Sequence, residues 1–120
     1  MNRLQHFLRA KTQYSLHSPF VYKLYTEVLF SRAPGAPHGR FEQTIWRLEQ
    51  HYGVKAQRHG DIAKLDAKDI FFMVINHPHR NEKSWNEVIE EPFYQVTLDF
   101  YSVGIAISNP RLSRQHFILR

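Results

Sequence analysis

The closing segment, Asp69–Arg120, constrains the fold more than any other part of this chain of 120 residues. It opens with an uninterrupted apolar run, Ile70–Ile75, whose length suits a strand covered on both faces of a sheet. Two later stretches, Tyr94–Ser108 and His116–Arg120, also have strand character, and a helix around Trp85 lies between the first strand and these. We therefore expect a sheet built from this segment, with the other residues packed over it.

The stretch Tyr94–Tyr101 alternates between apolar and polar residues, as a strand with one buried face does. The pattern predicts a buried side of Tyr94, Val96, Leu98 and Phe100 and a solvent-facing side of Gln95, Thr97, Asp99 and Tyr101. Gly104, in the strand that follows, marks a bulge or a close approach of another group to the backbone.

The first ten residues predict a short amphipathic helix. Leu4, Phe7 and Leu8 recur at helical spacing. A helix of under three turns is marginal alone, so we expect it to pack on its own domain, with a membrane-surface or partner helix as the alternative.

Two longer helices follow in the N-terminal half. The second helix begins after Ser18, a good N-cap residue, and has Pro19 at its first position. The third begins at Arg40 and ends at Gly53, where a glycine can adopt the left-handed conformation that stops a helix.

These features predict an α/β fold and one domain over residues 1–120, with a helical part at 1–53 and a sheet part at 54–120. We expect three N-terminal helices and the helix around Trp85 to pack on a mixed or antiparallel sheet of about four strands.

The composition excludes several classes of protein. The chain has no cysteine, which rules out disulfides and thiolate metal ligands and fits a reducing compartment. The N-terminus lacks the apolar run of a secretory signal, and no stretch approaches the roughly 18–20 apolar residues that span a membrane. We expect a soluble, cytoplasmic protein without a membrane partner.

The formal net charge of +5 is uneven along the chain. Residues 1–60 hold nine Lys/Arg against three Asp/Glu, whereas residues 61–120 hold seven against eight. A basic half suits a solvated helical surface, and it also allows a nucleic-acid-binding module built from Arg3, Arg9, Lys11 and the third helix. No run of adjacent basic residues forms a stripe, which favours the solvated surface.

Three histidines are candidates for a functional site. His77 and His79 directly follow the apolar strand, at the position where open α/β sheets bind ligands. A metal site needs a third or fourth ligand, and none follows at a recognisable spacing, so we interpret both as loop histidines. His17 is either a functional imidazole or a residue that fixes the start of the second helix.

The five glycines are scattered at positions 35, 39, 53, 60 and 104. Loops that bind phosphates or dinucleotides need clustered glycines, because the backbone must approach the ligand closely. The sequence therefore contains no nucleotide-binding loop.

Two blocks of the sequence resemble parts of one family. Ala10–Phe30 contains a basic stretch followed by HSPFVY, and Ile70–Arg120 contains, in order, an apolar strand, His77, a helix with Trp85, VTLDF, Gly104 and QHF. Both blocks are similar to the ends of a class I S-adenosylmethionine-dependent methyltransferase family of Bacteroidetes type. They cover about 70 of the 120 residues.

The resemblance implies a Rossmann-like fold whose middle is missing. Members of the family have a glycine-rich cofactor loop, an acidic residue for the ribose and further βα units, and they have an acidic pair where this chain has Val74, Ile75 and Asn76. The implied protein is truncated, binds no cofactor and is non-catalytic. If the family's activity were retained, S-adenosylmethionine would be the cofactor.

That alternative is an active methyltransferase or a small-molecule binder with an atypical site. Its candidate ligand or contact residues are His17, Tyr22, His77, His79 and Trp85, of which the first four are expected to converge in space. Trp85 is otherwise interpreted as a core residue.

The non-catalytic hypothesis predicts action through protein contacts. The missing βα units would leave sheet edges exposed, and exposed edges pair with a second copy or with another chain. We therefore expect a homo-oligomer or a protein partner. If the strands mirror the end of the family's sheet, the strand at Ile70–Ile75 lies near the segments at Tyr94–Ser108.

Overall fold

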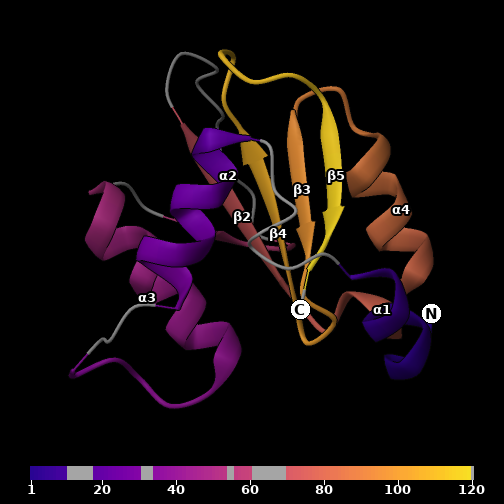
Figure 1. Ribbon diagram of the computed structural model, residues 1–120, viewed down its shortest axis with the longest axis horizontal. Helices are drawn as coiled ribbons and strands as arrows, with labels where there is room; N and C mark the ends of the chain where they lie inside the picture. Colours follow the sequence, from indigo (N-terminus) through magenta and orange to yellow (C-terminus); the bar gives the residue numbers. More distant parts are fainter. Residues whose placement is uncertain (11–17, 31–33, 54–55, 61–69, 120) are drawn as a thin grey trace.

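The computed structural model describes residues 1–10, 18–30, 34–53, 56–60 and 70–119. Within these ranges, five strands form one mixed sheet in the order β1-β2-β4-β3-β5 (Figure 1). The strands are β1 (Gln57–Arg58), β2 (Phe71–Asn76), β3 (Val96–Asp99), β4 (Val103–Ser108) and β5 (Gln115–Ile118). The predicted α/β class is confirmed, with one strand more than expected.

The helices follow the predicted order, with three before the sheet and one after its buried strand. They are α1 (Arg3–Arg9), α2 (Pro19–Lys23), α3 (Arg40–Tyr52) and α4 (Glu82–Glu90). A π-helix, η2 (Leu24–Leu29), continues α2, and a 3₁₀ turn, η3 (Pro78–Arg80), joins β2 to α4. The Ser18 side chain accepts a hydrogen bond from the Val21 amide at 3.4 Å, as its N-cap position predicts.

The sheet combines parallel and antiparallel pairs. β4 lies antiparallel between β2 and β3, whereas β1 is parallel to β2 and β5 is parallel to β3. Between β2 and β4, Phe71 pairs with Ser108 and Asn76 pairs with Val103. The apolar strand therefore lies beside the segments at Tyr94–Ser108, as expected, and β1 and β5 form the two edges.

Helices cover both faces of the sheet (Figure 1). α2, η2 and α3 pack on one face, where the largest core cluster includes Val21, Leu24, Leu48, Phe72, Leu98 and Ile107. α4 packs on the other face through a second cluster of Met73, Ile75, Trp85, Val88 and Ala106. Successive β2 residues thus belong to opposite clusters, which confirms that this strand is covered on both sides.

The prediction for one side of β3 is wrong. Thr97 and Asp99 were expected to face solvent, but they are only 2% and 1% exposed. α4 and α1 cover this side, so both faces of β3 are buried. Tyr101 lies beyond the strand in the turn to β4, with a left-handed φ of 70°.

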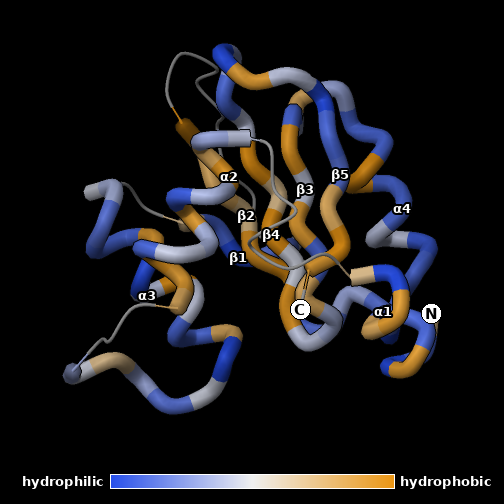
Figure 2. The backbone as a smooth tube through the Cα atoms, in the orientation of Figure 1, coloured by the Kyte–Doolittle hydropathy of each residue, from blue (hydrophilic) through white to orange (hydrophobic). Residues whose placement is uncertain are grey.

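α1 packs on its own domain, as expected, but not through its apolar side chains. Leu4, Phe7 and Leu8 are 67%, 53% and 70% exposed, and the buried residue of this helix is His6. Figure 2 shows α1 beside the lower end of the strands. A buried imidazole is tolerated here because the chain supplies it with hydrogen-bond partners, which are described below.

Gly104 marks a close approach and not a bulge. It pairs in register with Ile75 on one side and Asp99 on the other. A Cβ atom added to it would lie 2.9 Å from Trp85 Cη2, so the absence of a side chain lets the indole pack on the sheet. None of the helices in the described ranges is long and apolar enough to cross a membrane.

Candidate functional site

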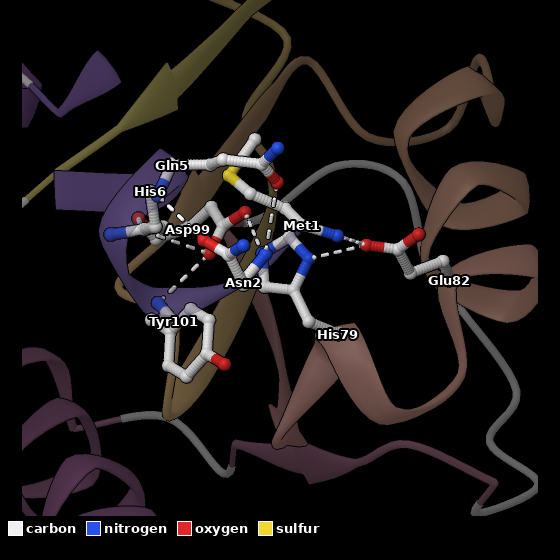
Figure 3. A network of polar contacts seen from close by, with 8 residues as sticks. All are labelled: Met1, Asn2, Gln5, His6, His79, Glu82, Asp99 and Tyr101. Atoms are coloured by element: carbon white, nitrogen blue, oxygen red, sulfur yellow. Dashed lines mark hydrogen bonds and ion pairs between the residues drawn. The ribbon is translucent and has the colours of Figure 1, made fainter. Parts of the chain in front are cut away.

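A polar network lies at the carboxyl ends of β2 and β3, on the face covered by α4 (Figure 3). Asp99 is the last residue of β3, and His79 belongs to η3, which follows β2. His6 reaches the same point from α1, about ninety residues away in the sequence. In open α/β sheets this end of the strands is where ligands bind, so the network is the candidate functional site.

The carboxylate of Asp99 is the centre of the network. Its Oδ2 lies 2.6 Å from His79 Nε2, and its Oδ1 accepts a hydrogen bond from the Tyr101 amide at 2.9 Å. His6 Nε2 lies 2.9 Å from the Asp99 carbonyl oxygen and 3.3 Å from Oδ1. A buried carboxylate is stable only when its oxygens are paired in this way.

His79 lies between two carboxylates. Its Nε2 faces Asp99, and its Nδ1 lies 3.0 Å from Oε1 of Glu82. Ionised carboxylates only accept hydrogen bonds, so this position suits an imidazole that donates from both nitrogens. The amino group of Met1 also contacts Glu82, and the Tyr101 ring stacks on His79 with centroids 5.4 Å apart.

A cavity of about 300 Å³ opens beside the network, between α1, α4 and β5. Its lining includes Arg9, Glu82, Trp85, Asp99 and His116. His116 Nδ1 lies 2.6 Å from the Thr97 hydroxyl. Although part of this side chain is open to solvent, desolvation of the ring lowers the pKa of His116 below its ordinary value of 6.5.

The residues that the sequence proposed as ligand or contact candidates do not all lie together in the structure. His79 is part of the network, and Trp85 is buried in the core between α4 and the sheet, as interpreted. His77 has a left-handed φ of 47°, and its amide donates to the Ser102 carbonyl at 2.9 Å. Tyr22 is exposed on α2, on the opposite face of the sheet from α4, and is not brought together with His79. His17 lies outside the described residues.

Sequence reasoning missed three residues of the site: His6, Asp99 and His116. Asp99 was assigned to a solvent-facing side, and His6 and His116 were not considered as site residues. One signal was present, since Asp99 ends a strand and polar residues at strand ends often bind ligands. Nothing in the sequence pairs it with a histidine so far away.

The described residues contain no group of three or more His, Cys, Asp or Glu side chains that could hold a metal ion. His79 Nε2 instead faces the Asp99 carboxylate, and His6 Nε2 donates to the Asp99 carbonyl oxygen. Comparison of the chain with protein-family models, with curated proteins and with solved structures gives no match.

The network predicts that acid loosens α1. Hydrogen bonds from the Met1 amino group and from His79 hold the pKa of Glu82 below its ordinary value of 4.5. Because the pKa of Glu82 is lower in the folded chain than in the unfolded chain, its ion pair stabilises the fold fully at a pH above the unfolded pKa. This stability is lost as the pH falls through the folded pKa of Glu82. Amide exchange of α1, followed by NMR from neutral pH into this acidic range, should accelerate.

Glu82→Gln should remove this acid step and leave α1 exchanging faster at neutral pH. Glu87→Gln, an exposed change on the same helix, is the matched control and should keep the step. Equal behaviour of the two variants would show that Glu82 does not hold α1.

Proposed function

We propose that this chain is a truncated, methyltransferase-like protein of the cytoplasm that does not catalyse and acts through protein contacts at the free edge of β5. One observation carries the proposal. The backbone groups of His116 and Ile118 point away from the sheet, where a further strand could pair with them.

This orientation follows from the hydrogen bonds between β5 and its neighbour. The Gln115 amide donates to the Gln95 carbonyl, and the Leu119 amide donates to the Asp99 carbonyl, each at 2.8 Å. Alternate residues of a parallel strand bond to the same neighbour, so residues 115, 117 and 119 face β3. His116 and Ile118 therefore face outward, and no hydrogen bond to their backbone from another described segment is present.

The non-catalytic part of the proposal is supported by what fills the strand ends. At the carboxyl ends of β2 and β3, His6 from α1 and His79 from η3 pack against Asp99. Asp99 is 1% exposed and its carboxylate oxygens already have partners, so it offers little to a ligand although it borders the cavity. The neighbourhood of β2 with the Tyr94–Ser108 segments is the one that the methyltransferase resemblance implies.

The glycines support the same proposal. Gly35, Gly39, Gly53 and Gly60 have positive φ angles, and no other group lies within 4 Å of the Cβ position of any of them. These four glycines lie in separate turns and at helix ends, and Gly104 makes room for the Trp85 indole. No cluster is left that could hold a nucleotide.

Calorimetric titration with S-adenosylmethionine tests the proposal. We expect no heat beyond dilution at millimolar cofactor, because the fold offers no glycine loop to receive it. Binding with a micromolar Kd would overturn the proposal. S-adenosylhomocysteine in the same titration shows whether any heat depends on the transferable methyl group.

A second function, binding of a small molecule, is favoured by the cavity beside His79 and His116. His79 lies between the carboxylates of Asp99 and Glu82, whereas desolvation lowers the pKa of His116. Two histidines in such different surroundings suit acid–base chemistry. Trp85 lines the cavity, so its fluorescence in the same titration reports on occupation.

A further inference from the structure

We propose that β5 binds an extended, acidic peptide segment of a partner protein, which adds a sixth strand to the sheet. This inference rests on the proposed function and names the chemistry of its partner. In strand addition, backbone hydrogen bonds supply affinity, and pockets for alternate side chains supply specificity. Both features are present along the outer side of β5.

The backbone offers four hydrogen-bonding groups in a row. His116 and Ile118 each present an N–H and a C=O outward, by the alternation that places residues 115, 117 and 119 against β3. These four groups have the spacing of a regular strand, so they can form hydrogen bonds with the backbone of two residues of an incoming strand.

The cavity lies on the same edge. The side chains of His116 and Ile118 both line it, because alternate residues of β5 point to the face covered by α4. A neighbouring strand places its side chains about 4.5–5.5 Å from those opposite. Every second side chain of an added strand would therefore reach the mouth of the cavity.

The charges around this edge favour an acidic segment. Arg111 and Arg114 precede β5, and Arg9 of α1 lines the cavity. Among the described residues, no carboxylate forms an ion pair with any of these three arginines. The carboxylates of the cavity are already engaged, Asp99 by His6 and His79 and Glu82 by the Met1 amino group. Arg114 donates to the Ile89 carbonyl at 2.8 Å, which is a neutral acceptor and leaves its charge unbalanced. Cations without a carboxylate partner on a binding edge select a partner of opposite charge.

The same charges disfavour a second copy as the occupant. Pairing of β5 with β5 of another copy would bring the arginines of both copies toward one edge. Basic residues on an edge strand are a common protection against self-pairing. An acidic strand meets no such repulsion.

The probe is a fluorescein-labelled peptide of alternating glutamate and valine, compared with its lysine–valine counterpart by fluorescence anisotropy. We expect the acidic peptide to bind about tenfold or more tightly than the basic one, and to lose affinity as salt is added. In amide exchange, bound peptide should protect the amides of His116 and Ile118.

Two variants separate the edge from the charge. Ile118→Pro removes an outward N–H and keeps the bonds to β3, so it should weaken acidic-peptide binding about tenfold or more. Arg111→Glu should weaken it as well, whereas Lys23→Glu, the same charge change on exposed α2, should not. Arg111→Glu keeps the test informative if the proline variant does not fold.

Other results would overturn the inference. Unprotected amides at His116 and Ile118, equal binding of the two peptides, or full binding to the Arg111→Glu variant would each do so. Concentration-dependent dimers that protect these amides without peptide would show that a second copy occupies the edge, and the proposed function would stand. Binding of S-adenosylmethionine would overturn the proposed function, whatever the peptide does.

Discussion

Replacing Asp99 with alanine is expected to lower the free energy of unfolding by about 3–5 kcal/mol, the usual cost of breaking a buried ionic network by removing one partner. The substitution leaves His79 and the Tyr101 amide without their acceptor, whereas His6 keeps the carbonyl oxygen of residue 99 and loses only its 3.3 Å contact with Oδ1. Both groups lie where water cannot readily replace the carboxylate, because Asp99 is 1% exposed. Urea unfolding followed by circular dichroism measures the loss.

Two controls show whether the loss comes from the network. Asp99→Asn keeps an acceptor for the Tyr101 amide but presents an NH₂ group to a histidine, so a smaller loss of about 1–3 kcal/mol is expected. Glu90→Ala removes an exposed carboxylate from α4 and should stay within about 0.5 kcal/mol of the parent. A loss below 1 kcal/mol for Asp99→Ala would mean that His79 and the Tyr101 amide find other partners.

The parts of the fold that sequence predicts are those set by local chemistry. The start of α2 at Pro19 follows from Ser18, and the end of α3 follows from the left-handed Gly53. The covered strand β2 follows from an apolar run with no polar interruption. Each of these needs only residues close in the chain.

The candidate site was not predictable because it depends on what covers each surface. Alternation shows that β3 has two sides, but it does not show that α1 and α4 bury the side with Thr97 and Asp99. The same limit applies to α1. Its apolar residues define a face, yet the hydrogen bonds of His6 to Asp99 decide which face turns inward.

The position of β5 at the edge of the sheet was not predictable from sequence either. The stretch His116–Arg120 has strand character, and the observed strand is Gln115–Ile118. Its position depends on a parallel pairing with β3 that no local pattern specifies. Whether an edge is free can therefore be known only once the order of the strands is known.

Substitution of Gly104 by alanine is expected to destabilise the fold by about 1–3 kcal/mol, the usual cost of overpacking a core. The added Cβ would lie 2.9 Å and 3.0 Å from two carbons of the Trp85 indole and 3.3 Å from Cγ of Pro78. The backbone of Gly104 is not in the left-handed region, so steric overlap accounts for the expected loss. Thermal or urea unfolding measures it.

A double-mutant cycle identifies the overlap with the indole as the cause. Trp85→Phe shortens the ring that meets Gly104. The double variant Gly104→Ala with Trp85→Phe should therefore lose less stability than the two single variants together, by about 0.5–3 kcal/mol. Gly35→Ala is the matched control, because its cost comes from a φ of +83° and nothing lies within 4 Å of its Cβ position. Its loss should add to that of Trp85→Phe within about 0.5 kcal/mol. Simple additivity for Gly104→Ala as well would show that the indole moves aside at no cost.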